Sequence, residues 1–388
     1  MYYFGALPIS LCLFGWLATE DENAAIHYLT AFLQARSLPA VIDSSTTDDG
    51  KVGFANLLSD EQTSFLDRTE TVAAKQRFLL ATSSENCDWT RFAISQSQTD
   101  EINKGAHRLA RIILLFARKQ YEAGNWDSGN DLVVRTMFMA RHVARQARTG
   151  ENQCYMIENM ARCTVSAYLL SMPQDSRLLI DRRIRELSSF VPMREMFLLE
   201  AALADELAGM IDSSKLDEME ALRRLRVLLR DGGSQKIAAD FSRQEMAVFL
   251  RDLSSCFSDL SELMPRPIPD AMKEFNDNIG PKIKRNPMAL LTFGSGSEIM
   301  WLRIEDAQSE CRAAMFRTAV KFVDDGESAI IHGRDPFGDG PFTIRKENSG
   351  FTILSALRDD GLQIDLRIGL AANSIASKIG GQSGAPAN

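Results

Sequence analysis

Side chains that could hold a transition metal are few in this 388-residue chain, and they lie far apart in sequence. The four histidines are His27, His107, His142 and His332. None belongs to a His-x-x-x-His or His-Glu-x-x-His pattern, which would place two ring nitrogens on one helix face. Distant ligands can converge in a fold, but this spacing by itself predicts no zinc site. We interpret His142, which follows Arg141, as a helix-surface or packing histidine.

Acidic side chains offer two other kinds of chemistry. Asp359, Asp360 and Asp365 lie close together around Gly361, and clustered carboxylate oxygens are the ligands that Ca²⁺ prefers. A weak calcium site there is one hypothesis, and a solvated acidic turn is the other. A glycosidase-type enzyme needs two carboxylates held about 5–10 Å apart across a cleft. Segment 193–211 carries several acids, but Glu200 and Asp205 are five residues apart and do not share a strict helix face, so their spacing establishes no such pair.

Motifs for nucleophilic or phosphate chemistry are absent from the sequence. There is no Gly-x-Ser-x-Gly elbow, no Gly-x-x-x-x-Gly-Lys-Ser/Thr loop and no Gly-x-Gly-x-x-Gly turn. The short turn from Gly294 to Ser297 could bind an anion through its backbone N–H groups, which is a weak signal. The six cysteines form no Cys-x-x-Cys pair, and we interpret them as small buried side chains, with one disulfide as the alternative in an exported protein. No cofactor is expected.

Four side chains could instead line a binding surface for a protein or peptide partner: Tyr121, Trp126, Arg141 and His142. They follow or flank a short turn that begins at Gly124, a residue suited to the left-handed conformation that ends many helices. Core packing is the alternative role of the two aromatic side chains.

The overall charge excludes a general role in nucleic-acid binding. The net charge is -8 and the isoelectric point is about 5.3, whereas a nucleic-acid binder needs a basic surface. Basic stretches at 223–230 and 282–285 are flanked by acidic residues, so we interpret them as solvated helix faces. Hydrophobic residues make up 45% of the chain, which is enough to bury a large core.

Residues 1–18 are apolar or small throughout, and acidic residues begin directly afterwards at Glu20 and Asp21. This abrupt change is typical of a signal or membrane-anchor segment. The run is marginal in length for a membrane span, contains Pro8 and has no Lys or Arg before its apolar core. We therefore expect an exported or envelope-associated protein that is attached through residues 1–18 or loses them. A buried apolar N-terminal arm is the alternative.

The elements that must position these side chains are mostly helices. Apolar residues recur at helical spacing, and Gly, Pro and polar loops separate the periodic segments. Ser59 and Gln62 form a capping box at the start of a helix that we expect to run to about Leu80. Further helices are predicted at about 21–35, from about 100 to the turn at Gly124, from that turn to Gly150, and at 154–170, 175–189, 193–211, 216–230, 241–263, 268–279 and 298–325.

The fold class that follows is mainly α, as a stack of antiparallel helical hairpins. The segment around Tyr121 is similar to one hairpin of a tetratricopeptide repeat, but no strict 34-residue recurrence exists, so an irregular helical bundle is the alternative. Apolar runs on either side of residues 347–350 predict a small C-terminal β-hairpin. We divide the chain into the N-terminal segment 1–18, a helical array at 19–326, a hairpin region at 327–370 and a flexible tail at 371–388.

Short motifs in two regions carry a resemblance to known proteins. They are Asn23-Ala24-Ala25, Cys87-Asp88-Trp89, Gly124-Asn125-Trp126 and Met139-Ala140-Arg141-His142 in the first region, and Asp335-Pro336-Phe337, Gly340-Pro341-Phe342 and Asp359-Asp360-Gly361 in the second. With these motifs the chain resembles an uncharacterised family of exported or membrane-anchored bacterial proteins of planctomycete-type genomes. The second region also resembles the C-terminal hairpin of type II secretion pseudopilins, although Ile344 stands where an aromatic residue is usual. The resemblance implies export and fold, and it implies no activity.

These patterns favour a non-enzymatic, envelope-associated helical scaffold or protein- or peptide-binding protein. One alternative is a cell-wall hydrolase with carboxylates from separate helices. Another is a secretion-system accessory protein, which the C-terminal hairpin alone suggests.

Overall fold

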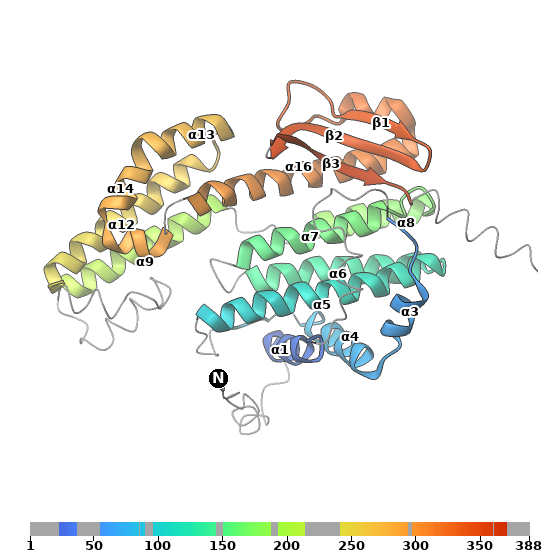
Figure 1. Ribbon diagram of the computed structural model, residues 1–388, viewed down its shortest axis with the longest axis horizontal. Coiled ribbons are helices and arrows are strands. Elements are labelled where there is room, and N and C mark those ends of the chain that lie inside the picture. Colours follow the sequence, from blue (N-terminus) through green and yellow to red (C-terminus); the bar gives the residue numbers. More distant parts are fainter. Residues whose placement is uncertain are drawn as a thin grey trace, which may run out of the picture.

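A computed structural model describes residues 23–36, 55–84, 86–89, 96–144, 150–187, 193–213, 241–293, 297–359 and 361–370. Over these ranges the protein is mainly helical, with a small antiparallel sheet near the C-terminus (Figure 1). The predicted fold class, mainly α with a C-terminal hairpin, is confirmed. The predicted segments 1–18, 216–230 and 371–388 lie outside the described residues.

A first group of helices surrounds the larger core. Its members are α1 (Ala24–Gln34), α3 (Asp60–Leu66), α4 (Thr69–Ala81), α5 (Gln96–Glu122), α6 (Trp126–Ala144), α7 (Gly150–Ser166) and α8 (Gln174–Glu186). Helices α5, α6 and α7 lie side by side, and α1 packs against α4 and α5 (Figure 1). The apolar stripe of α5 faces this core, where Leu109, Ile112 and Ile113 are at most 1% exposed.

Local signals place the ends of these helices. The capping box at α3 is present, because the Gln62 N–H donates to Ser59 Oγ (3.2 Å) and the Ser59 N–H donates to Gln62 Oε1 (3.0 Å). Gly124 has a φ of 79° between α5 and α6, as predicted. The single helix expected up to Leu80 is wrong, because the chain is extended at Arg68 (φ −67°, ψ 143°) and α4 begins there as a second helix.

A second group of helices has its own core. It contains α9 (Met193–Asp212), α12 (Arg243–Leu263), α13 (Ile268–Glu274), a π-helical turn η2 (Phe275–Ile279), α14 (Gly280–Arg285) and α15 (Pro287–Phe293). Helices α9 and α12 pack along each other, and Arg251 of α12 pairs with Asp212 at the end of α9. Helix α15 was not predicted, and α14 carries the basic stretch 282–285, which was interpreted as a solvated helix face but was given no helix range. Pro281 and Pro287 lie in the first turns of α14 and α15, where a backbone N–H group has no partner within the helix, so the missing N–H of proline costs no hydrogen bond.

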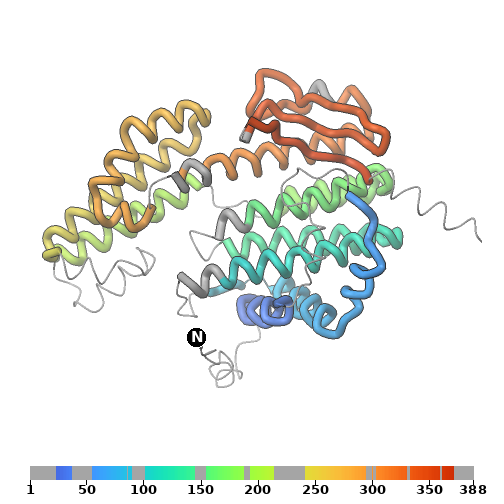
Figure 2. The backbone as a smooth tube through the Cα atoms, in the orientation of Figure 1, coloured from blue at the N-terminus to red at the C-terminus, as the bar shows by residue number. Residues whose placement is uncertain are grey.

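The long helix α16 (Ser297–Asp325) links the two cores (Figure 2). Ile299 near its start belongs to the smaller core, whereas Ala307, Cys311 and Met315 belong to the larger one. A 3₁₀ helix, η3 (Gly326–His332), then leads towards the sheet. Among the described residues, no helix is both long and apolar enough to cross a bilayer.

The C-terminal sheet packs on α16 and on α7. Its strands are β1 (Thr343–Glu347), β2 (Gly350–Asp359) and β3 (Leu362–Ile368), in the order β1-β2-β3 with antiparallel pairing. The predicted hairpin corresponds to β1 and β2, and β3 is an additional strand. Its sequence does alternate, because Ile364, Leu366 and Ile368 are buried between polar neighbours.

Candidate functional site

The turn between α5 and α6 keeps Tyr121 inside the protein. The ring is 2% exposed, and its hydroxyl donates to Asn130 Oδ1 (2.9 Å). Its centroid lies 5.0 Å from that of Tyr168 and 6.0 Å from that of Trp126. Burial raises the pKa of Tyr121 well above its usual value, and Tyr168 adds to the effect. Trp126 covers this cluster and remains half-buried.

His142 lies in a neighbouring aromatic cluster between α1 and α6. His142 is 1% exposed, and its ring Nδ1 lies 3.2 Å from the Tyr28 hydroxyl oxygen. The Trp89 indole N–H donates to the His142 carbonyl oxygen (3.1 Å), and the Tyr28 ring stacks on the Trp89 ring. Helix α1, which follows the Asn23-Ala24-Ala25 motif, and the Cys87-Asp88-Trp89 motif are therefore both joined to α6 by this cluster.

Arg141 belongs to a buried charged cluster between α6 and α7. Its Nε donates to Glu158 Oε1 (2.8 Å), and Arg162 Nη2 donates to Glu158 Oε2 (2.6 Å). Glu158 has no solvent exposure, and both arginines are less than 10% exposed. Burial lowers the pKa of Arg162, and the Glu158 carboxylate opposes that effect. The single carboxylate therefore offsets the positive charge of two interior guanidinium groups.

The expected binding surface made of Tyr121, Trp126, Arg141 and His142 needs correction. Three of the four side chains are interior, so only Trp126 contributes to the protein surface. The reason is the position of α6, which packs against α5, α7 and α8. A helix enclosed in this way buries polar side chains as well as apolar ones.

The acidic residues of the calcium hypothesis are only partly described. Asp359 ends β2 opposite Leu362, whereas Asp365 pairs in register with Leu354. Asp365 therefore lies three positions further along β3, which is roughly 10 Å. It also accepts a hydrogen bond from Arg367 Nε (3.1 Å). Asp360 lies outside the described residues, within which no group of three or more possible ligands gathers for a metal ion. The calcium site stays a prediction.

The acidic segment 193–211 forms most of α9 and presents a different feature. Its carboxylates do not face one another across a cleft; Glu195, Asp205 and Glu206 are exposed on the outside of the helix. Three leucines on that same helix are also exposed, Leu198 at 44%, Leu199 at 60% and Leu203 at 52%. We call these six residues the outer α9 face. A signal for it existed in the sequence, since α9 has more apolar residues than one buried stripe requires.

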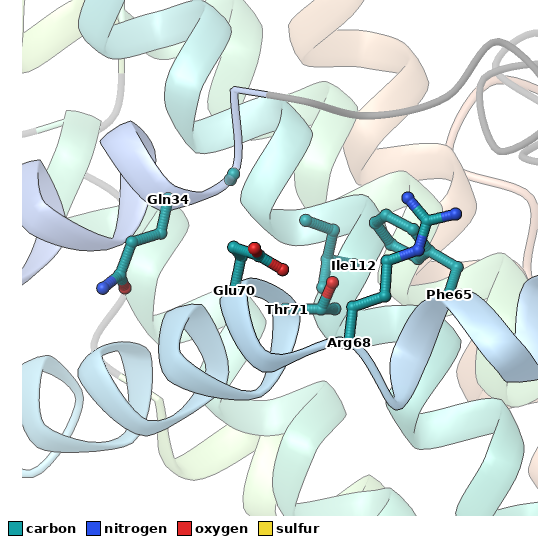
Figure 3. A pocket seen from close by; sticks show the side chains of 7 residues that line it. Gln34, Phe65, Arg68, Glu70, Thr71 and Ile112 are labelled. Carbon is teal, nitrogen blue, oxygen red and sulfur yellow. The ribbon is translucent and has the colours of Figure 1, made fainter.

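A small hollow lies where α1 ends beside α3, α4 and α5 (Figure 3). Its volume is about 130 Å³, and its lining residues are Gln34, Ala35, Phe65, Arg68, Glu70, Thr71 and Ile112. Sequence patterns did not indicate it, because its walls come from segments that are distant in the chain. Arg68 and Glu70 stand at its exposed rim, and the Arg68 guanidinium lies over the Phe65 ring, 5.4 Å from the centroid.

Comparison with known proteins finds no relative of this chain. No protein family, no curated protein and no solved structure matches the chain. The resemblance of its motifs to an uncharacterised bacterial family and to pseudopilins therefore stays a prediction.

Proposed function

We propose that this protein is a non-enzymatic helical scaffold of the cell envelope that binds a protein partner through the outer α9 face. The observation that supports this proposal most is the exposure of Leu198, Leu199 and Leu203 on one helix. Contiguous exposed apolar side chains rimmed by polar ones are typical of interaction sites. Val248 of α12 and Leu290 of α15 add exposed apolar side chains to the same group of helices.

The charges around the leucines indicate the chemistry of the partner. Glu195, Asp205 and Glu206 give the outer α9 face a negative rim, so a partner with Lys or Arg beside its apolar residues is favoured. An amphipathic helix with a basic border meets both requirements. A second copy of this chain would instead bring like charges together. Covering three half-exposed leucines contributes about 3 kcal/mol, which suits a reversible complex.

The enzyme alternative needs carboxylates that face each other in an open cleft. Among the described residues, the buried carboxylates Glu158 and Asp335 are already engaged. Glu158 binds two arginines, and Asp335 accepts hydrogen bonds from the Ser355 hydroxyl (2.8 Å) and the Ala356 N–H (2.6 Å). These contacts anchor the Asp-Pro-Phe turn to β2, which is a structural role.

A photo-crosslinking side chain at position 199 tests the proposal in the full chain, expressed in its native cells. We expect one discrete adduct with a partner, and we expect Leu203→Asp in the same chain to abolish it. The control places the same crosslinker at Leu80, an exposed leucine of α4 (50%) that lies outside the outer α9 face. No discrete adduct at position 199, an adduct equally strong at position 80, or an adduct unaffected by Leu203→Asp would refute the proposed surface.

The identified partner then gives a direct measurement. The dissociation constant of the purified pair should rise at least tenfold after Leu199→Asp, because a charge replaces apolar contact area. It should also rise at high salt, because salt screens the acidic rim. Circular dichroism should show an unchanged melting temperature, since exposed substitutions rarely alter stability. Fractionation of cells that express the chain with and without residues 1–18 tests envelope association: only the longer chain should sediment with membranes.

A further inference from the structure

The hollow at the end of α1 carries charged groups that the fold itself does not use. Neither Arg68 nor Glu70 forms an ion pair or a side-chain hydrogen bond with the described residues. The Gln34 Oε1 atom is buried at the same hollow and also has no hydrogen-bond partner there. A guanidinium, a carboxylate and an amide oxygen thus border one small space without neutralising one another.

Arg68 stands at a position where folding alone favours other residues. It is the N-cap of α4, and its side chain makes no capping hydrogen bond. Ser, Thr, Asp and Asn are preferred there, and a cation next to the positive end of the helix dipole is unfavourable. The helix dipole favours Glu70 in the first turn of α4 and disfavours Arg68, whose contact with the Phe65 ring does not require the N-cap position. Residues that break a local preference are expected at functional or strained positions.

The walls of the hollow are partly apolar and well buried. Ala35, Phe65 and Ile112 are at most 5% exposed and come from three different helical regions. The Thr71 hydroxyl and the Glu70 carboxylate point towards the space from one side, with the Arg68 guanidinium beside the Phe65 ring on the other (Figure 3). The stacking of Arg68 on Phe65 holds the guanidinium at the rim with its N–H groups available.

The size of the hollow restricts its ligand. At about 130 Å³ it is well below the roughly 300 Å³ at which sites for drug-sized ligands begin. A nucleotide or a stretch of peptide therefore does not fit inside it. A molecule of a few heavy atoms with one positive and one negative group matches both the volume and the two rim charges.

We propose that this hollow binds a small zwitterion of the free α-amino-acid class. Its carboxylate pairs with the Arg68 guanidinium, which presents a donor fork suited to a carboxylate. Its ammonium group pairs with the Glu70 carboxylate and the Thr71 hydroxyl. A short aliphatic side chain, as in alanine, contacts Phe65 and Ile112.

Calorimetric titration of the full chain with alanine tests the proposal. We expect saturable binding in the millimolar range, and at least tenfold weaker binding of acetate or ethylammonium, because each offers only one of the two charges. Arg68→Met and Glu70→Gln should each weaken alanine binding at least tenfold. Arg182→Met and Glu186→Gln on α8 are the matched controls, since this pair is exposed (64% and 65%) and lies outside the hollow; they should leave binding unchanged.

A further variant separates loss of the ligand from loss of the fold. Arg68→Ser supplies a preferred N-cap, so its melting temperature should rise while alanine binding is lost. The proposal is overturned if alanine shows no saturable binding up to tens of millimolar, or if acetate binds as tightly as alanine. It is also overturned if the Arg68 and Glu70 variants bind alanine like the wild type.

Discussion

Replacing Glu158 with glutamine removes the negative charge between two buried arginines and nearly preserves the shape of the side chain. In the wild type, Glu158 Oε1 lies 2.8 Å from Arg141 Nε and Oε2 lies 2.6 Å from Arg162 Nη2. Two unit charges about 4 Å apart attract by about 4 kcal/mol at an effective dielectric constant near 20. The variant loses this attraction twice and leaves two interior cations that repel each other. Breaking a buried ion pair on one side typically costs about 3–5 kcal/mol, which is the loss that we expect.

Urea unfolding followed by far-ultraviolet circular dichroism measures this loss as a lower midpoint with an unchanged slope. Glu186→Gln is the matched control, because it removes one carboxylate from an i,i+4 pair with Arg182 on the surface of α8. It should cost about 0.5 kcal/mol or less. Added salt should leave the effect of Glu158→Gln nearly unchanged, because a buried pair is poorly screened. A loss below about 1 kcal/mol, or one equal to that of the control, would refute the reasoning.

Three further predictions concern packing, pH and capping. Gly129→Ala places a Cβ atom 2.4 Å from the Tyr121 ring, so it should destabilise the fold by about 1–3 kcal/mol. The new Cβ atom of Gly209→Ala meets no atom within 4 Å, so this variant should stabilise α9 by about 0.5–1 kcal/mol. Equal melting temperatures of the two variants would contradict this prediction. Burial raises the pKa of the Cys311 thiol to about 11, so its contribution to stability is complete below pH 9 and should be lost between pH 9 and 11. Cys311→Ala should flatten that part of the stability curve, and an unchanged curve would exclude the thiol as its cause. Asn23→Ala removes a buried N-cap with two accepted hydrogen bonds and one donated, so chemical unfolding should show a loss of about 1–3 kcal/mol, and a loss under 0.5 kcal/mol would count against the cap.

Several elements of the fold followed from short stretches of sequence. The capping box of Ser59 and Gln62 and the left-handed Gly124 were both predicted, because each depends on hydrogen bonds or backbone angles within a few residues. Helix α12 (Arg243–Leu263) lies within the predicted segment 241–263. The break at Arg68 escaped prediction because no Gly or Pro marks it.

The candidate sites depended on tertiary structure to a much greater degree. Tyr28 and His142 meet across 114 residues, and Arg141 meets Glu158 across 17. Nothing in the local pattern distinguishes Arg141 from an arginine on a solvated helix face. The outer α9 face also depended on tertiary structure: α9 has more apolar residues than one buried stripe requires, but the sequence does not show which of its leucines are exposed.

The sequence by itself determined the mainly helical fold class, many helix ends and the C-terminal hairpin, because hydrophobic period, caps and turn residues act over one or two turns of the chain. It did not determine which side chains are buried, because burial depends on how α5, α7 and α8 pack around α6, and on which face of α9 packs against α12 among the described residues. The hollow at Arg68 is a further case. Its lining residues come from three helical regions that are distant in the sequence. The local sequence feature connected with it is a cation, Arg68, at the N-cap of α4, and this can be recognised only when the start of α4 is known.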